Sequence, residues 1–374
     1  MGIVYGQKKV LASRLLELVS FVFLYPFTKH RAGEPQGITK ILLVEPFQMG
    51  DVLSLLCMLK PLQQAYPAAQ IFMLTKPSSG AIMTYDRRIA AVLSVDIPWS
   101  DHGRKHITIS RLFRAMRFAW RLRKEKFDLA IDTRGDVRSQ ILMATAGCRY
   151  RLGYTGYLQS DIRLKGWLLT HPAGHSPYPH RYEWNAFLLT KLGVREDQVF
   201  PLSFPCFVND RLLTARANNS LVIHVGGGWE FKRWSVEKWS DLIHRIRDRY
   251  DQVTVIGGPG EQAILQRLTQ LVGDKGNVIF KTTTLDELVT VLADCSQFIG
   301  LDSGPMNLAV CMDKAVIALF GPGDSSMWKP ANSKGKYVHK VEKFPCHPCL
   351  QLTCAFPAKS CMQEIQVEDV MRLL

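Results

Sequence analysis

Residues Lys40–Val52 read KILLVEPFQMGDV, an apolar run followed by a short loop and the start of a second apolar segment. A run that is hydrophobic at nearly every position is typical of a strand buried on both faces of a parallel sheet. Gly50 permits a tight turn after this strand, and a helix is predicted over residues 51–66. A strand joined directly to a helix is the repeating unit of an α/β fold.

The alternation of strand and helix continues along the chain in two series. The first has predicted strands at Lys40–Glu45, Ile71–Thr75, Val92–Val95 and Asp128–Asp132, with helices over 51–66, 109–125 and 136–147. In the second, strands begin near Leu221, Val253, Asn277, Gln297 and Ala315, with helices near 235–250, 260–272, 285–294 and 305–313. Two series predict two Rossmann-like, doubly wound α/β domains. Because ligands bind beyond the carboxyl ends of parallel strands, we expect the domains to face each other across a cleft.

The proline-rich region 171–220 separates the two series. We therefore expect an apolar and basic N-terminal extension over residues 1–37, a first domain over 38–210 and a second over 211–374. A chain of 374 residues with 47% hydrophobic and 21% charged residues can bury two ordinary cores, which excludes disorder of the whole chain.

The composition also restricts the partners of the protein. A formal net charge of +14 indicates an anionic partner, which could be nucleic acid, acidic lipid or a phosphorylated substrate. No apolar run reaches the roughly 18–20 uncharged residues of a confident membrane span, which argues against a polytopic membrane protein. Nine cysteines are too few for a small secreted disulfide scaffold.

The segment Arg104–Lys126 carries nine lysines and arginines and a single acid. On a helix it would present a cationic face beside an apolar one, and the arginines at helical spacing are Arg111, Arg114, Arg117 and Arg121. This pattern is typical of a helix on a membrane surface, and a core-packed helix with a solvated basic face fits it about as well. Nucleic acid is the weaker interpretation, because no nucleic-acid-binding motif accompanies the stripe.

A second membrane indication is the apolar segment Leu15–Phe27 (LLELVSFVFLYPF). It is too short to cross a bilayer as a regular transmembrane helix, and its length suits a helix lying in the membrane interface. The alternative is a helix packed against the first domain. We favour the interface, with the body of the protein in the cytoplasm.

The loop His224–Ser235 (HVGGGWEFKRWS) follows the first strand of the second series. Three consecutive glycines let the backbone approach a ligand and aim N–H groups at it; they are Gly226, Gly227 and Gly228. Lys232 and Arg233 can neutralise phosphate oxygens, and the positive end of the next helix adds to this charge. We interpret the loop as a phosphate-binding site rather than a solvated surface turn.

Two more loops carry polar residues directly after predicted strands. The loop Gly300–Ala309 contains Asp302, Ser303 and Gly304 ahead of a helix. Since Ser303 can cap that helix, Asp302 is expected to be free to bind ligand hydroxyls. Glu261 follows another strand and is placed to bind ribose hydroxyls.

Asp51 has two interpretations. It can cap the helix that it opens, or it can act as a general base that is ionised at neutral pH. A helix N-terminus favours the anion, so Asp51 would be a weak base suited to late removal of a proton from an alcohol that attacks a reactive electrophile.

Several familiar motifs are missing from the sequence. It contains no complete G-x-G-x-x-G fingerprint with an acidic residue at the expected offset, no P-loop, no H-E-x-x-H and no G-x-S-x-G. A dehydrogenase, a P-loop phosphotransferase and a serine hydrolase are therefore disfavoured. The sequence also lacks a D-x-D pair for a metal–diphosphate complex.

Together these loops resemble glycosyltransferase family 9, the ADP-heptose–lipopolysaccharide heptosyltransferases. The matching segments occur in order within residues 38–370; they are Met49–Val52, Asp128–Gly135, His224–Trp234, Gly300–Ala309 and Ala318–Pro322. The resemblance implies two facing Rossmann-like domains (the GT-B architecture), inversion at the anomeric carbon and no required metal or other cofactor.

The resemblance also implies roles for single residues. Asp51 is similar to the base that deprotonates the acceptor hydroxyl, and Lys232 to the residue that holds the donor diphosphate. Asp302, Ser303 and Gly304 match the loop around the sugar and phosphates, and Glu261 matches the ribose contact. Asn307 stands where many relatives have histidine, which leaves the donor sugar open.

The function implied is transfer of a sugar, heptose in this family, from ADP-heptose to an anionic lipopolysaccharide-core-type acceptor. We expect a monomer without a nucleic-acid partner, peripheral on the cytoplasmic face of the inner membrane. Two alternatives stay open: a non-catalytic protein that binds nucleic acid or acidic lipid, and a nucleotide-sugar epimerase on a related scaffold.

Four cysteines near the C-terminus form the pattern C-x2-C-x4-C-x6-C; they are Cys346, Cys349, Cys354 and Cys361. Their number would suit zinc, but the spacing between pairs is short for a four-cysteine zinc ribbon. We expect structural cysteines here and assign no metal.

Overall fold

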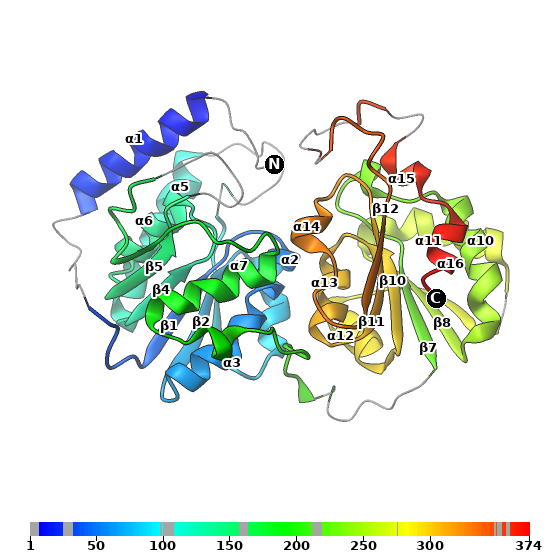
Figure 1. The fold of residues 1–374 in the computed structure, drawn as a ribbon, viewed down its shortest axis with the longest axis horizontal. Helices are drawn as coiled ribbons and strands as arrows, with labels where there is room; N and C mark the ends of the chain where they lie inside the picture. The colour runs from blue at the N-terminus through cyan, green and yellow to red at the C-terminus, as the bar shows by residue number, and fades with distance from the viewer. Residues whose placement is uncertain are drawn as a thin grey trace. The chain divides into compact units, whose positions relative to one another are not determined.

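The computed structural model describes residues 7–24, 33–97, 99, 108–156, 164–210, 212, 219–274, 276–347, 349, 354–356 and 360–374. The chain divides into two compact units, Met1–Ser203 and Phe204–Leu374, which we call unit 1 and unit 2 (Figure 1).

Unit 1 contains a six-stranded sheet in which every neighbouring pair of strands is parallel. In the spatial order β3-β2-β1-β4-β5-β6, the strands are β1 (Lys40–Val44), β2 (Gln70–Thr75), β3 (Ile89–Ser94), β4 (Leu129–Asp132), β5 (Tyr150–Tyr154) and β6 (His171–Ala173). The chain runs outward from β1 to β3 and returns to β4 on the other side of β1. In doubly wound folds, this reversal leaves a crevice for ligands beyond the carboxyl ends of the two central strands.

The helices of unit 1 cover its sheet. They are α1 (Gln7–Leu24), α2 (Met49–Leu53), α3 (Leu56–Ala65), α4 (Pro77–Gly80), α5 (Ile109–Arg121), α6 (Val137–Thr145), α7 (Arg181–Phe187) and α8 (Glu196–Val199). Both α1 and α5 contact α6, whereas α3 packs against α7. Leu42 and Val44 from β1 join Ala119 of α5 and Leu142 of α6 in one buried core.

The prediction of one continuous helix over residues 51–66 is wrong, because this segment forms two helices, α2 and α3. The break lies at Ser54 and Leu55. The Ser54 hydroxyl donates to the carbonyl of Asp51 at 2.6 Å, and a side chain that bonds back to the preceding turn tends to bend a helix. The strands β5 and β6 were not predicted; β5 is fully buried but contains Arg151 and Gly153, which interrupt the apolar run.

Helix α1 is attached to unit 1 by a buried carboxylate. Glu17 is 1% exposed and accepts hydrogen bonds from the backbone N–H groups of residues 165–167, at 2.9, 2.6 and 3.3 Å. Phe21 packs on Trp167, with ring centroids 5.2 Å apart. The helix is therefore packed against the body of the unit, as the alternative interpretation expected, yet several of its apolar side chains remain exposed; they are Leu11, Leu15, Leu18, Val22 and Phe23. Within the described part of the chain, no helix combines the length and hydropathy needed to cross a bilayer, and residues 25–27 of the predicted apolar segment lie outside the described residues.

Unit 2 repeats the topology of unit 1. Its parallel sheet has the order β12-β11-β10-β7-β8-β9, formed by β7 (Ser220–His224), β8 (Gln252–Gly257), β9 (Val278–Thr282), β10 (Gln297–Leu301), β11 (Ala315–Phe320) and β12 (Gly335–His339). Counted from its first strand, each unit therefore has the order 3-2-1-4-5-6. The prediction of two doubly wound α/β folds is confirmed.

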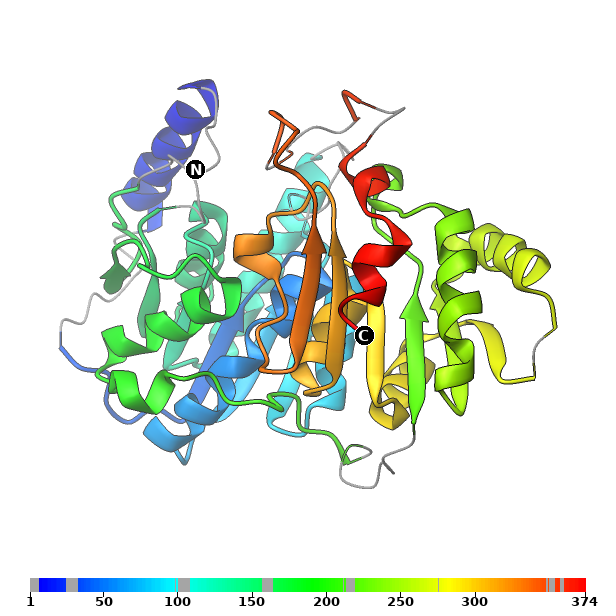
Figure 2. The same cartoon turned by 45° about the vertical axis from the view of Figure 1, so that its right-hand side comes forward.

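Helices cover the sheet of unit 2 as well. They are α10 (Val236–Ile246), α11 (Gln262–Val272), α12 (Leu285–Asp294), α13 (Gly304–Cys311), α14 (Ser325–Trp328), α15 (Cys361–Glu364) and α16 (Val367–Met371). Helix α10 contacts both α11 and α16, and the three lie together on one side of the unit (Figure 2). Trp239 of α10 is fully buried in the core beneath them, edge-on to Trp234.

Candidate active site

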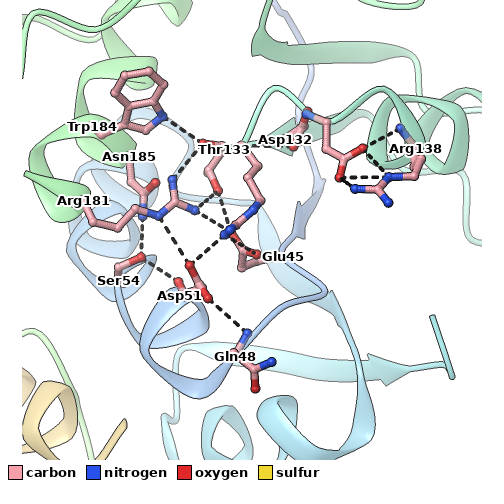
Figure 3. A network of polar contacts seen from close by, with 12 residues as sticks. Glu45, Gln48, Asp51, Ser54, Asp132, Thr133, Arg138, Arg181, Trp184 and Asn185 are labelled. Atoms are coloured by element: carbon pink, nitrogen blue, oxygen red, sulfur yellow. Dashed lines mark hydrogen bonds and ion pairs between the residues drawn. The ribbon is translucent and has the colours of Figure 1, made fainter. Parts of the chain in front are cut away.

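Two loops of unit 1 meet where its strand order reverses. Strands β1 and β4 are neighbours, with Val44 opposite Asp132, so the segments that follow them lie side by side. Asp51 comes from α2, and Arg134 comes from the loop after β4. The Arg134 Nη1 atom lies 2.7 Å from Oδ1 of Asp51, although 83 residues separate them in the chain. Figure 3 shows Asp51 close to Glu45 and Arg181, which come from other segments of unit 1.

Asp51 is held at both carboxylate oxygens. Oδ2 accepts the backbone N–H of Gln48 at 3.1 Å, which places the side chain at the start of α2. The Asp51 side chain is 10% exposed. Burial by itself would raise the pKa of Asp51, but the guanidiniums of Arg134 and Arg181 hold it below its ordinary value. The carboxylate is therefore ionised and faces a cation. Asp51 does not open the helix as expected from the sequence, because α2 begins at Met49 and Asp51, at its third position, accepts the backbone N–H of the N-cap residue Gln48.

Beneath Asp51 lies a second, fully buried ion pair. Arg181 of α7 donates to Oε2 of Glu45 at 2.5 Å and to the carbonyl of Thr133 at 3.0 Å. Burial raises the pKa of Glu45, and the neighbouring guanidiniums of Arg134 and Arg181 oppose this effect. Arg181 Nε is also 4.0 Å from Oδ1 of Asp51. Two carboxylates and two guanidiniums thus form one cluster at the end of the sheet.

The position of Arg134 depends on a turn built around Asp132. The Asp132 carboxylate accepts the backbone N–H groups of Arg134, at 3.1 Å, and of Asp136, at 3.0 Å. Burial and the nearby Asp136 raise the pKa of Asp132 to about 8, against the effect of the N–H of Arg134. Sequence reasoning did not select Glu45, Arg134 or Arg181; the one available signal was that D-T-R-G follows a predicted strand.

In unit 2, the predicted donor residues come together in the same way. Strand β7 lies between β8 and β10, so the loops after these strands are neighbours. Lys232 Nζ is 2.8 Å from Oδ2 of Asp302, and Arg233 Nη2 is 3.9 Å from Oε1 of Glu261. The sequence interpretation thus selected side chains from three loops that are adjacent in the fold.

The glycines of this loop differ in their surroundings. A Cβ on Gly226 would lie 2.8 Å from Cδ of Glu261 and 2.9 Å from Nε2 of His224, so the backbone approaches its neighbours too closely for a side chain. A Cβ on Gly227 would be 3.4 Å from the Leu301 side chain, an ordinary contact. A Cβ on Gly228 would meet none of the described atoms within 4 Å. Packing inside the unit therefore accounts for the glycine at position 226 and not for the one at 228.

Two details of the loop after β10 correct the sequence interpretation. Asp302 is not free, because Lys232 holds its carboxylate. Ser303 is the N-cap residue of α13 but makes no capping bond through its side chain; its Oγ lies 3.3 Å from Nδ1 of His224 instead. Asn307 holds this turn instead. Its side-chain amide donates a hydrogen bond of 3.0 Å to the backbone carbonyl of Ser303, the residue before Gly304.

Burial determines the charge of the histidine beside these loops. Burial lowers the pKa of His224 to about 4, so the imidazole is neutral near pH 7. Glu261 accepts the backbone N–H of Gly258 at 2.8 Å, which fixes the turn after β8. Positive charge at these loops therefore comes from Lys232 and Arg233.

Helix α5 differs in part from its prediction. Arg111 is paired with Asp96 through two hydrogen bonds of 2.8 and 2.5 Å and is 17% exposed. The remaining arginines of the stripe are exposed; they are Arg114, Arg117 and Arg121. Small residues, Ala115 and Ala119, are buried against the unit, whereas Leu112, Phe113 and Trp120 are exposed. Residues 104–107 of the predicted segment lie outside the described residues.

The four C-terminal cysteines are free thiols in the structure. Burial raises the pKa of Cys361 to about 11. Among the described residues, no group of three or more His, Cys, Asp or Glu side chains is arranged to hold a metal ion. Residues 348, 350–353 and 357–359 of this segment lie outside the described residues.

The chain is similar in sequence to known glycosyltransferases. The model of glycosyltransferase family 9 (heptosyltransferase) matches residues 115–359, well over half of the chain. Lipopolysaccharide heptosyltransferase 1 of Pseudomonas aeruginosa is 27% identical over 325 residues, which cover 85% of this chain and 88% of that protein. Lipopolysaccharide heptosyltransferase 2 of Escherichia coli K12 is 22% identical over 81% of this chain and 90% of its own length.

Solved structures share the fold. The structure of E. coli ADP-heptose lps heptosyltransferase II matches with a TM-score of 0.68 and 17% identity, over 90% of this chain and 97% of that one. The E. coli heptosyltransferase WaaC with ADP-2-deoxy-2-fluoro heptose matches with a TM-score of 0.66 and 21% identity, over 80% and 93%.

Proposed function

The chain belongs to glycosyltransferase family 9, and we propose that it transfers a heptose from ADP-heptose to a lipopolysaccharide-core-type acceptor with inversion at the anomeric carbon. The observation that carries this proposal is the ionised Asp51, which lies at the switch point of unit 1, where doubly wound folds bind ligands.

Asp51 is the general base of the proposed reaction. The acceptor oxygen bonds to the anomeric carbon from the face opposite the diphosphate, the bond from that carbon to the diphosphate oxygen breaks, and the hydroxyl proton passes to Asp51. A carboxylate with a lowered pKa is a weak base. It suits a proton that leaves late, when the attacking oxygen has already become acidic by bonding to carbon.

The loops of unit 2 are the proposed donor site. Lys232 and Arg233 supply the charge that stabilises the departing ADP, and the backbone N–H groups of the glycine-rich loop add hydrogen bonds. Asp302, released from Lys232 when a phosphate takes its place, would accept hydroxyls of the donor sugar. Glu261 would accept ribose hydroxyls. Because these cations can neutralise the diphosphate, we propose a reaction that requires no divalent metal.

Unit 1 is the proposed acceptor side, and it would bind the cytoplasmic face of the inner membrane peripherally. Exposed arginines of α5 lie beside exposed Phe113 and Trp120. Cations next to aromatic side chains suit an anionic lipid surface, where the acceptor would be anchored. The exposed apolar side chains of α1, including Leu15 and Phe23, are available for the same surface.

The test is a transfer assay with purified protein, ADP-heptose and lipopolysaccharide acceptor extracted from cells that cannot add heptose. We expect ADP release that depends on the acceptor and persists in EDTA. Asp51→Asn should lower kcat by about 10²–10⁴-fold with ADP affinity unchanged, as for the loss of a general base. Full transfer by Asp51→Asn would refute the assignment of the base, and activity that EDTA abolishes and Mg²⁺ restores would refute the metal-free reaction.

A further inference from the structure

Arg134 is bonded to the carboxylate that would receive the proton of the acceptor hydroxyl in the proposed reaction. Its Nη1 atom is 2.7 Å from Oδ1 of Asp51, and the backbone N–H of Gln48 already occupies Oδ2. A hydroxyl that gives its proton to Asp51 must form a hydrogen bond with that same carboxylate first. Both oxygens of the Asp51 carboxylate thus already accept a hydrogen bond, one from Arg134 and one from Gln48.

Of the two guanidiniums beside Asp51, Arg134 is the one that a substrate can reach. The Arg134 side chain is 12% exposed, whereas that of Arg181 is completely buried and bonded to Glu45. Arg134 also stacks on the ring of Phe47, with Cζ 3.9 Å from the ring centroid. The ring provides a flat surface along which the guanidinium can shift without losing its contact.

A second acceptor for Arg134 is already in place. Oε1 of Glu45 is buried and accepts no hydrogen bond from any described residue, and it lies 3.7 Å from Arg134 Nη1. A buried carboxylate oxygen without a donor is unfavourable. A shift of Arg134 away from Asp51 and toward Glu45 would satisfy this oxygen while it uncovers Asp51.

Charge balance favours such a shift when the acceptor itself is anionic. When Asp51 takes up the proton of the acceptor hydroxyl, Arg134 loses the negative charge with which it is paired. The loss of one neighbouring negative charge destabilises a largely buried guanidinium, even with Glu45 still 3.7 Å from it. A carboxylate or phosphate next to the reacting hydroxyl would replace that charge through a bidentate contact.

We propose that Arg134 covers Asp51 in the free enzyme and is drawn off it by an anionic group of the acceptor, so that the base becomes available only when that acceptor is bound. This inference rests on the proposed function, in which Asp51 is the base. It makes Arg134 both a contact to the acceptor and a safeguard against hydrolysis of the donor.

Hydrolysis is the side reaction that the cover prevents. In it, a water oxygen bonds to the anomeric carbon, the bond from that carbon to ADP breaks, and the water proton passes to Asp51. The products are free heptose and ADP. While Arg134 remains on Asp51, a water molecule has no accessible base to receive its proton.

The experiment uses the full chain with ADP-heptose and no acceptor, and it measures ADP release from Arg134→Gln, Arg134→Lys and the control Arg138→Gln. Arg138 lies in the same segment but is paired with Asp136, at 2.6 Å. We expect Arg134→Gln to hydrolyse the donor several-fold faster than the wild type, and Arg138→Gln to match the wild type. Adding Asp51→Asn to Arg134→Gln should return hydrolysis to the background rate, a result that general loosening of the loop would not produce.

With acceptor present, Arg134→Gln should raise the KM for the lipopolysaccharide acceptor about tenfold, equivalent to about 1.4 kcal/mol. If Arg134→Gln does not fold, the same two measurements are made on Arg134→Lys. A lysine cannot make the bidentate contacts of a guanidinium, so the same two changes are expected from it. Unchanged hydrolysis and unchanged acceptor KM in the folded variants would overturn the inference. If Asp51→Asn retains transfer, it is the proposed base that fails instead, so the two failures are distinguishable.

Discussion

The ammonium of Lys232 lies 2.8 Å from Oδ2 of Asp302, so the cation expected to bind a diphosphate is held by a carboxylate from a loop 70 residues further along the chain. The pair is partly exposed, with side-chain exposures of 24% and 13%, so it can exchange with an anionic ligand. The ion pair keeps Lys232 extended toward the loop after β10 in the absence of a donor, and a phosphate oxygen would compete with Asp302 for it.

Replacing Lys232 should therefore weaken donor binding. We expect Lys232→Met to reduce ADP affinity by about 1.5–3 kcal/mol, the usual size of a charge-assisted phosphate contact. Isothermal titration with ADP measures the change. Lys334→Met is the matched control, because Lys334 is paired with Asp313 and lies outside the donor loops. Equal affinity in the Lys232 variant and the wild type would remove Lys232 from the donor site.

The pH dependence of transfer should show the low pKa of Asp51. In the proposed reaction transfer needs the ionised form of Asp51, and the pKa of this residue lies below its ordinary value of 3.8. The acid limb of kcat/KM, which reports the free enzyme, should therefore lie below pH 3.8 or be hidden by unfolding. In Arg134→Gln the largest opposing charge is gone and burial still raises the pKa of Asp51, so the acid limb is expected at a higher pH than in the wild type. The pH dependence of kcat/KM, measured for the wild type and for Arg134→Gln, tests this expectation. An acid limb at the same pH in both proteins would contradict the role given to Arg134.

Asp51 also links the stability of unit 1 to pH. A carboxylate whose pKa is lower in the folded state stabilises that state at pH values above its unfolded pKa, and this contribution is lost as the pH falls through the folded pKa. Asp51→Asn should therefore unfold with a shallower pH dependence below about pH 4 than the wild type. Urea unfolding at several pH values tests this expectation.

Two neighbouring glycines should respond differently to alanine. A Cβ at position 226 would overlap Glu261 and His224, so Gly226→Ala should lower the free energy of unfolding by about 1–3 kcal/mol. Gly228→Ala meets no described atom and should leave stability unchanged. If the backbone at 228 approaches the donor phosphates, the same variant should bind ADP more weakly. Denaturant unfolding together with ADP titration separates the two effects, and unchanged ADP affinity would exclude Gly228 from the phosphate contact.

The exposed arginines of α5 should govern binding to anionic vesicles. The triple change of Arg114, Arg117 and Arg121 to Gln is expected to reduce sedimentation with vesicles containing phosphatidylglycerol, and salt should reduce the binding of the wild type. Arg111→Gln is the control, because Arg111 is paired with Asp96 and contributes little net charge at the surface. Binding that is equal in all three proteins would exclude α5 as the membrane contact.

Much of the candidate donor site could be predicted from local sequence. Gly226 to Gly228, Lys232 and Asp302 all follow apolar runs that form parallel strands, and the carboxyl ends of parallel strands meet at one edge of a sheet. Residues in such loops therefore converge whenever the strands are correctly recognised. Strands without an apolar run were missed: β5 contains the buried Arg151, whose guanidinium is bonded to the carbonyls of Cys148 and Leu168 rather than exposed to solvent.

The chain by itself determined the α/β class and the loops that form the candidate site, because hydrophobic periodicity and glycine positions are local properties. The tertiary structure decided which charges meet. Arg134 covers Asp51, Arg181 is buried against Glu45, and Glu17 receives three N–H groups from a segment nearly 150 residues away. Each of these pairings depends on how segments distant in the sequence pack together, so the residues around a carboxylate do not indicate which partner will be buried beside it.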